Sequence, residues 1–383
     1  MRIAFYAPLK PPDHPVPSGD RLVARLLMAA LTRGGHDVEL AAHLRSWDGT
    51  GDEARQAHIR DTATHMAAQL VRRYQAAPPA ARPHAWFTYH LYHKAPDWLG
   101  PPVSDALGIP YLVAEASIAN KQANGPWRLG HEAATLAVAR ADAIISLNAA
   151  DDGGLRPWLA EPARLHHLAP FLDPASFAAA WTARSTHRAT LARAHDLDST
   201  QPWLVAVAMM RTGDKLRSYT LLAEALKQIT EHRWQLAVAG DGPARAQVEE
   251  ILSPLGRDRI RFVGRLDETA LPGFYAAADL YVWPAVREAF GMALLEAQAA
   301  GCPVVAGAEG GVPGIVHDGE TGLLAPPGDA RAFAHAIARM LGDADLRRRM
   351  GADAARRAMA DHGIEGAAQA LDAILARVTV QAS

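Results

Sequence analysis

The sequence of 383 residues contains a single cysteine, Cys302, so no disulfide can form within the chain. Cys302 lies in the apolar run GCPVV, which predicts a small core residue in a protein from a reducing compartment. No run reaches the roughly 18 uncharged apolar residues that a membrane-spanning helix needs. We therefore expect a cytoplasmic protein, and peripheral contact with the inner face of a membrane stays open.

The chain also lacks an excess of charge of either sign. Its 39 basic and 41 acidic side chains give a formal charge of −2, without the basic field of a nucleic-acid binder. The hydrophobic share of 49% is typical of a globular protein, and the length predicts two or three domains. We expect no nucleic acid among its partners, and the composition does not indicate an oligomeric state.

The signatures of common cofactors are missing as well. The segment APLKPPDHPVPSGDR contains only Gly19, and AGDGPARA contains Gly240 and Gly242 without the third glycine of a dinucleotide fingerprint. No G-x-x-x-x-G-K-[ST] occurs, which excludes a P-loop. The DLD triplet of Asp196 and Asp198 falls in a predicted linker and not at a predicted site. We therefore expect neither a metal nor another cofactor.

What the chain does contain is a regular alternation of apolar runs with helix-length segments. In the helix predicted for Gly19–Arg33, five apolar residues between Leu22 and Leu31 share one face. Short runs rich in Val, Ile and Leu between helices are typical of parallel strands buried on both faces, that is, of α/β doubly wound sheets. The predicted strands are Ile3–Tyr6, Val38–Ala41, Ala85–Tyr89, Tyr111–Ala114, Ala143–Leu147, Leu165–Leu168, Trp203–Met209, Gln235–Ala239, Ile260–Val263, Leu280–Trp283, Pro303–Ala306 and Gly322–Leu324.

A break in this alternation marks a domain boundary. Residues 170–202 have prolines near both ends and no strand-like run, and the tail from Asp329 onward is nearly all helical in pattern. We predict Rossmann-like domains over 1–175 and 176–360, and a helix over 361–383 that packs back on the first domain. Because ligands of doubly wound sheets bind at the carboxyl ends of the strands, we expect a site in a cleft between the domains.

Two cations and one helix start point to a diphosphate. Arg211 and Lys215 follow a predicted strand, and a guanidinium fork with an ammonium suits phosphate oxygens. A solvated basic loop is the alternative. Phe290 and Gly291 open a predicted helix, whose first N–H groups attract anionic or hydroxyl oxygens, and glycine permits close backbone approach.

Two glutamates lie in the same region. Glu288 follows a predicted strand and Glu296 lies inside the apolar helix that follows. An ionised carboxylate only accepts hydrogen bonds, so it suits the two hydroxyls of a vicinal diol. By itself a pair of glutamates is weak evidence, since glutamates are common on helix surfaces.

With its neighbours, however, the pair resembles a known family. The stretch from Met209 to about Arg339 looks like the carboxyl-terminal domain of family 4 retaining glycosyltransferases of the GT-B fold, in which two Rossmann-like domains face a cleft. The matching pieces are, in order, Arg211 with Lys215, VAGDGP, RFVGRLDETALPGFYAAADLYVWP, EAFGMALLEAQAAGCPVVA with Glu288 and Glu296, GG and DGETGLLAPPGD.

The resemblance implies roles for these residues. In the family the first glutamate contacts hydroxyls of the donor sugar and the second contacts the ribose, so we assign Glu288 and Glu296 to them. Arg211 and Lys215 would neutralise the leaving diphosphate. The remaining donor-binding residues implied are Gly19, Gly264, Arg265, Phe290, Gly291 and Met292, with Gly264 and Arg265 beside the base.

The amino-terminal half resembles the family less. Where many members have a histidine after a strand, this chain has Glu115, Ala116 and Ser117. The segment WFTYHLYHKAPDWLG (86–100) combines polar groups with aromatic rings, which suits an acceptor sugar or a lipid head; packing of the rings onto a sheet is the alternative. His90 is our acceptor-side catalytic candidate, and His90 with His93 lacks a third metal ligand. Gly314 replaces a glutamate usual in relatives.

We therefore expect a retaining hexosyltransferase that uses a nucleoside-diphosphate sugar in glycan or glycolipid synthesis. UDP is favoured over GDP because uridine donors are commonest in the family, and the acceptor is expected to be a saccharide or a lipid-linked molecule. A nucleotide-sugar 2-epimerase of the same fold and a non-catalytic nucleotide-sugar-binding protein are the alternatives. Family members react by front-face attack, and no glycosidase-type carboxylate pair stands out here.

Overall fold

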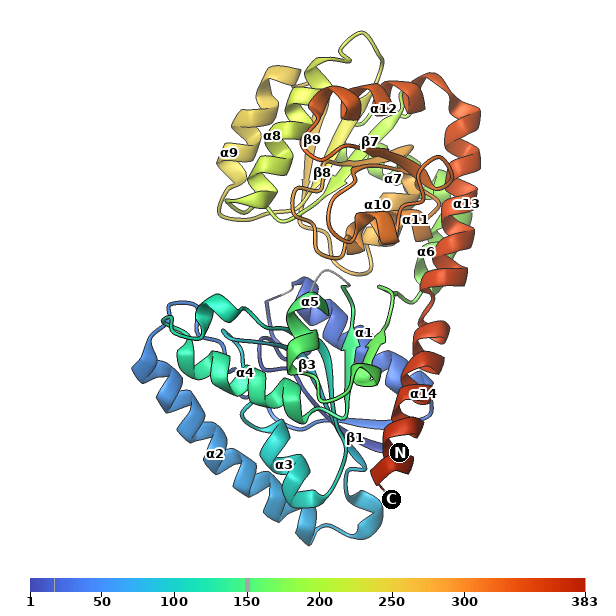
Figure 1. Ribbon diagram of the computed structural model, residues 1–383. Helices are drawn as coiled ribbons and strands as arrows, with labels where there is room; N and C mark the ends of the chain where they lie inside the picture. Colours follow the sequence, from blue (N-terminus) through green and yellow to red (C-terminus); the bar gives the residue numbers. More distant parts are fainter. Residues whose placement is uncertain (17, 149–151, 383) are drawn as a thin grey trace. The chain divides into compact units, whose positions relative to one another are not determined.

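The computed structural model describes residues 1–16, 18–148 and 152–382. They form two compact units (Figure 1). Unit 1 consists of residues 1–169 with the segment from Ile364 onward, and unit 2 is Pro170–Gly363. Each contains a six-stranded sheet in which every strand pair is parallel, which confirms the predicted α/β class.

The sheet of unit 1 has the strand order β2-β1-β3-β4-β5-β6. The strands are β1 (Arg2–Tyr6), β2 (Asp37–Leu40), β3 (Ala85–Tyr92), β4 (Tyr111–Ser117), β5 (Ala143–Ser146) and β6 (Leu165–His167). The order reverses at β1, because the chain crosses from β2 back over β1 to β3. Most residues of the central strands β3, β4 and β5 are apolar and buried, as expected for strands covered on both faces.

Helices cover this sheet on both faces. They are α1 (Gly19–Arg33), α2 (Glu53–Ala76), α3 (Gly100–Leu107), α4 (Arg128–Arg140), α5 (Asp152–Leu155) and α14 (Ile364–Ala382), with short 3-10 turns at Pro79–Ala81, Asn120–Gln122, Arg156–Trp158 and Pro162–Arg164. The predicted helix Gly19–Arg33 is confirmed. Ser18 caps it by accepting a hydrogen bond from the Arg21 N–H at 3.3 Å. Helix α14 packs along α1 (Figure 1).

The sheet of unit 2 has the order β12-β11-β10-β7-β8-β9. Its strands are β7 (Trp203–Val207), β8 (Gln235–Ala239), β9 (Ile260–Gly264), β10 (Leu280–Trp283), β11 (Val304–Gly307) and β12 (Gly322–Ala325). Its helices are α6 (Ala175–Thr182), α7 (Arg184–His195), α8 (Asp214–Lys227), α9 (Arg245–Leu252), α10 (Leu271–Ala277), α11 (Met292–Ala299), α12 (Ala330–Gly342) and α13 (Ala344–His362), with 3-10 turns at Ser253–Leu255 and Val312–Gly314. No described helix has the length and apolarity needed to cross a bilayer.

The segment without a predicted strand contains α6 and α7. Unit 2 begins at Pro170, ahead of the predicted start at residue 176, because its first residues are bonded to the end of α13. The Leu172 N–H donates to the carbonyl oxygen of His362 at 3.0 Å, and the His362 Nδ1 lies 2.7 Å from the carbonyl oxygen of Pro170. The polypeptide therefore enters and leaves unit 2 at the same place.

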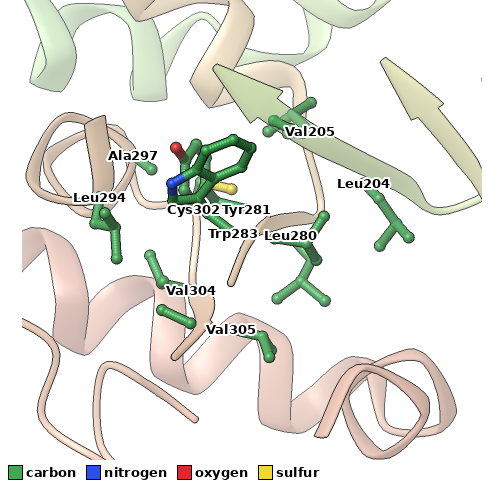
Figure 2. Packing of buried hydrophobic residues seen from close by; sticks show 14 of the residues in the cluster. Leu204, Val205, Leu280, Tyr281, Trp283, Leu294, Ala297, Cys302, Val304 and Val305 are labelled. Carbon is green, nitrogen blue, oxygen red and sulfur yellow. The ribbon is translucent and has the colours of Figure 1, made fainter. Parts of the chain in front are cut away.

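The core of unit 2 includes buried residues of β7, β10, β11 and the helix α11. Figure 2 shows side chains of this cluster, among them Tyr281, Trp283 and Cys302, which are at most 1% exposed. Burial of each large apolar side chain contributes about 1.5–3 kcal/mol to folding. Cys302 is the small core residue that the sequence predicts, and burial raises the pKa of its thiol.

Candidate functional site

The predicted cations of unit 2 follow the carboxyl end of β7. The strand stops at Val207, two residues earlier than predicted, and a loop leads to α8. Arg211 is exposed in that loop, where its guanidinium contacts the sulfur of Met209. Lys215, the second residue of α8, is only partly exposed. Both cations thus follow the strand as predicted, but the Lys215 side chain is less exposed than that of Arg211.

Lys215 is held by Glu288. The Lys215 Nζ lies 2.5 Å from the Glu288 Oε2 and 5.5 Å from the centre of the Trp283 ring. The Trp283 Nε1–H donates to the same carboxylate oxygen at 3.3 Å. Only 18% of the Glu288 side chain is exposed, so this carboxylate has limited freedom. Residues far apart in the sequence therefore set its direction.

The loop that carries Glu288 has an unusual backbone. Ala285 and Arg287 have φ angles of 58° and 49°, which cost non-glycine residues about 1–2 kcal/mol each. The glycines of the predicted GG piece support this loop from behind. A Cβ on Gly310 would lie 2.0 Å from the Glu288 carbonyl oxygen, and the Gly311 N–H donates to that oxygen at 3.1 Å. Glycine is required there by close backbone approach.

Helix α11 begins directly after this loop. Gly291, at φ 72°, is its N-cap, and Met292 is its first residue. The Leu294 N–H donates to the Gly291 carbonyl oxygen at 2.9 Å. The first N–H groups of the helix have no partner within it, so the predicted segment around Phe290, Gly291 and Met292 presents backbone donors.

The second glutamate, Glu296, lies inside α11 as predicted. Its Oε2 accepts a hydrogen bond from the hydroxyl of Tyr275, a fully buried residue of α10, at 2.8 Å. Burial raises the pKa of Glu296 from 4.5 to about 7. The nearby charge of Glu268 also raises this pKa, and the hydrogen bond from Tyr275 lowers it. Burial, with the charges of both glutamates, also raises the pKa of Tyr281 far above 10.

The predicted base-binding loop begins at the end of β9. Gly264 has a φ of 76° and Arg265 is exposed. The glycines of the AGDGP piece have a packing reason. A Cβ on Gly240 would lie 2.0 Å from the carbonyl oxygen of Ala208, and one on Gly242 would lie 2.3 Å from that of Met210. These two glycines therefore let their loop pack closely on the loop of Arg211.

In unit 1, the start of α1 lies beside the acceptor-side candidate. Gly19 is the first residue of α1, and the carboxylate of the next residue, Asp20, lies 3.1 Å from the His90 Nδ1. Burial acts to raise the pKa of Asp20, but the hydrogen bond and charge of His90 outweigh it and lower that pKa. Gly19 thus belongs to a cluster of unit 1, and the other predicted donor-binding residues belong to unit 2.

The backbone of His90 corrects the predicted end of its strand. We expected the strand to stop at Tyr89, but β3 continues to Tyr92 through His90 at φ 62°. The neighbouring strand β4 has Glu115 at φ 56° in the corresponding position of the register, where the pairing skips from Tyr89–Ala114 to Leu91–Ala116. The Glu115 Oε1 lies 3.8 Å from the His90 Nδ1. Glu115 thus lies beside His90, in the segment where the family histidine is missing.

Other residues of the 86–100 segment have structural contacts. Trp86 and Tyr89 are at most 1% exposed, so ring packing explains them. Asp97 is buried and accepts hydrogen bonds from Thr88 and from the first N–H groups of α3. His93 lies with its ring 5.7 Å from that of Trp127. In the part of the chain that the structure describes, no three His, Cys, Asp or Glu residues are placed to hold a metal ion.

Several residues of these clusters are not predicted from the sequence. Tyr275 and Trp283 lie within the matching pieces but received no role, and their signal is a polar ring atom on an otherwise apolar element. Asp20 was missed although it is acidic and in the first turn of a helix beside Gly19. Glu115 was noted only as the replacement of a histidine.

The sequence is similar to known proteins. Residues 193–357 match the family described as glycosyl transferases group 1. The chain is 30% identical over 241 residues to the alpha-D-kanosaminyltransferase of Streptomyces kanamyceticus, covering 62% of this chain and 61% of that one. It is 33% identical over 234 residues to the D-inositol 3-phosphate glycosyltransferase of Salinispora tropica, covering 58% and 48%. The match thus spans less than two thirds of either relative.

Solved structures show the fold. The Anabaena protein HepE, solved in complex with UDP and glucose, superposes with a TM-score of 0.70 at 16% identity, over 98% of this chain and 99% of that one. The two parallel sheets, the order of glycine loops and glutamates along unit 2, and these likenesses agree. Residues 193–357 of the chain thus resemble the glycosyl transferases group 1 family, and the chain has the GT-B fold.

Proposed function

We propose that this protein is a retaining glycosyltransferase that moves a hexosyl group from a nucleoside-diphosphate sugar to a saccharide or lipid-linked acceptor. The observation that carries the proposal is the pairing of Lys215 with Glu288 at 2.5 Å, at the start of α8 and just after β10. A cation for phosphate and a carboxylate for hydroxyls thus stand side by side, which matches the two ends of the bond that a nucleotide sugar breaks.

The donor side follows from these contacts. Glu288 would accept hydrogen bonds from hydroxyls of the donor sugar, while Lys215 and Arg211 would neutralise charge on the leaving diphosphate. Backbone N–H groups from Phe290 to Met292 would bind sugar or phosphate oxygens. Glu296 would accept the ribose hydroxyls. Gly264 and Arg265 would lie at the base.

The reaction proposed is a front-face displacement. The bond between the anomeric carbon and the phosphate oxygen breaks, and the acceptor oxygen bonds to that carbon on the same face. The acceptor proton passes to the leaving phosphate. No protein nucleophile is required, and the Glu288 carboxylate, already bound by Lys215 and Trp283, serves to hold hydroxyls.

The acceptor side is proposed around His90. Asp20, at 3.1 Å, would hold a proton on the His90 Nδ1 and so leave the Nε2 to accept a hydrogen bond from an acceptor hydroxyl. The Glu115 carboxylate would accept a second hydrogen bond from the hydroxyls of the acceptor substrate. A relative named for D-inositol 3-phosphate supports a polyhydroxylated acceptor, and a fold relative solved with UDP supports a uridine donor.

Binding and transfer assays test the proposal. We expect UDP to raise the melting temperature more than GDP or ADP, because a ligand stabilises the state that binds it. We then expect transfer from a UDP-hexose to continue in EDTA. Stabilisation by no nucleotide would contradict the proposal. Binding without transfer or hydrolysis would favour the non-catalytic alternative, and release of an epimerised sugar would favour the 2-epimerase.

A further inference from the structure

We propose that Tyr275 is a positioning residue for nucleotide binding, because its hydroxyl holds the Glu296 carboxylate in the orientation that accepts the ribose hydroxyls. This inference rests on the role proposed above for Glu296. Tyr275 is not expected to touch the nucleotide, and it acts through the glutamate.

The contact between the two side chains is direct. The Tyr275 hydroxyl donates to the Glu296 Oε2 at 2.8 Å. A carboxylate has about four acceptor positions, so one such bond leaves enough for the two hydroxyls of a ribose. Bonds of this kind to an ionised acceptor are stronger than neutral ones and fix direction. Tyr275 therefore limits the rotation of a side chain that would otherwise turn about three bonds.

The Tyr275 ring is itself immobilised. It is fully buried, with ring centres of Phe177 on α6 at 6.5 Å and Tyr281 on β10 at 6.0 Å. These distances are within the range of favourable aromatic pairs. Because the ring is packed in this way, the position of its hydroxyl oxygen is nearly fixed.

Helix α10 is anchored by the segment that follows the domain boundary. The guanidinium groups of Arg184 and Arg188 on α7 donate to the carbonyl oxygens of Ala276 and Ala277 at 2.6 and 2.7 Å. Both also pair with Asp279, at 2.8 and 2.9 Å. These bonds give partners to the last carbonyl groups of α10, directly after Tyr275. Helix α7, through these bonds, and helix α6, through Phe177, therefore hold the tyrosine that orients Glu296.

The contact between Tyr275 and Glu296 can be measured through the pKa of Glu296. Burial raises the pKa of Glu296 to about 7, the Tyr275 hydrogen bond opposes this, and the charge of Glu268, ahead of α10, adds to it. On β10, the charge of Glu296 contributes to raising the pKa of Tyr281. Helix α6 and strand β11, which also pack on α11, have no charged side chain, and the charged residues of α13 are not among the groups that act on Glu296.

The experiment is calorimetric titration with UDP between pH 6 and pH 8.5. Only ionised Glu296 accepts both ribose hydroxyls, so UDP affinity falls as the pH falls through its pKa. In Tyr275→Phe we expect this fall to begin at higher pH, with about a 10-fold weaker Kd at pH 7 and a smaller difference at pH 8.5. Glu296→Gln shows the pH dependence that belongs to the UDP phosphates alone.

A matched control comes from unit 1. Tyr111 is also a buried tyrosine whose hydroxyl donates to a carboxylate, that of Asp97 at 2.9 Å. Tyr111→Phe should leave UDP binding unchanged at every pH. In a double-mutant cycle, Tyr275→Phe should have little further effect once Glu296 is Gln.

The outcomes separate this inference from the proposed function. If Tyr275→Phe binds UDP like the wild type across the pH range while Glu296→Gln is weakened, the positioning role is overturned and Glu296 keeps its role. If Glu296→Gln also binds normally, the proposed role of Glu296 fails. Should Tyr275→Phe not fold, Glu296→Asp tests the same contact by withdrawing the carboxylate one methylene, and wild-type affinity there overturns the inference.

Discussion

The two units have the same architecture, but their candidate sites are assembled differently. In unit 2, Trp283, Glu288 and Glu296 follow one another within a short stretch of chain, and glycine loops pack around them. In unit 1, Asp20 and Glu115 reach His90 from other elements. The site of unit 2 can therefore be recognised as a pattern in the sequence, whereas the cluster of unit 1 cannot.

Both sites nevertheless have one property in common. Each contains a pair of non-glycine residues with positive φ, namely Ala285 with Arg287 and His90 with Glu115. Such conformations cost free energy and persist only where the surroundings enforce them, and they are concentrated at functional sites. The comparison therefore supports a functional role for the unit 1 cluster, although its sequence resembles the family less.

The largest expected effect concerns the cations of unit 2. Replacing Arg211 and Lys215 together by alanine should remove about 3–5 kcal/mol of transition-state stabilisation, because both neutralise the leaving diphosphate. The measurement is kcat/KM for transfer. Arg217→Ala is the control, since this residue of the same helix forms an exposed ion pair with Asp214. Wild-type activity in the double variant would mean that the cations are a solvated loop.

The next effect separates the two glutamates. Glu288→Gln should lower kcat by ~10²-fold or more, because the carboxylate acts near the reacting carbon. UDP affinity should barely change, since UDP lacks the sugar. Glu296→Gln should instead weaken UDP by about 1.5–3 kcal/mol. Calorimetry on both variants decides this, and equal losses of UDP affinity would show that the roles are wrongly assigned.

A smaller effect is expected in unit 1. His90→Gln should lower transfer by ~10²-fold, the lower end of what a positioned acid or base contributes. UDP binding and hydrolysis of the donor by water should stay near wild type, because the change affects the acceptor alone. His58→Gln, on the exposed face of α2, is the control. Loss of UDP binding in His90→Gln would place this histidine on the donor side.

The smallest effect concerns stability. The pKa of Glu296 is raised from 4.5 to about 7, so its ionisation destabilises the fold: the cost is absent below pH 4.5, grows as the pH rises and is complete above pH 7. Glu296→Gln removes this cost and should raise the Tm of unit 2 at pH 8 by a few degrees. At pH 4.5 the two proteins should melt together, and a Tm difference independent of pH would contradict the ionisation argument.

Much of the fold could be predicted from the sequence. Apolar runs of strand length between amphipathic helices were sufficient for all the predicted strands, because burial on both faces demands such runs. The ends were less certain: β7 stops before Met209, and β3 continues past Tyr89. In β3, His90 has a left-handed backbone and lies beside Asp20 and Glu115 of other elements, and local propensity predicts neither.

The sequence by itself determined the order of the elements, the place of each glutamate relative to its strand or helix, and the glycines that close approach requires. Only the tertiary structure decided which groups touch. Lys215 meets Glu288 across 73 residues, and Tyr275 meets Glu296 across 21. Periodicity reports which face of an element is buried. The partner across that face depends on how sheets and helices pack, and it is this packing that orients both carboxylates.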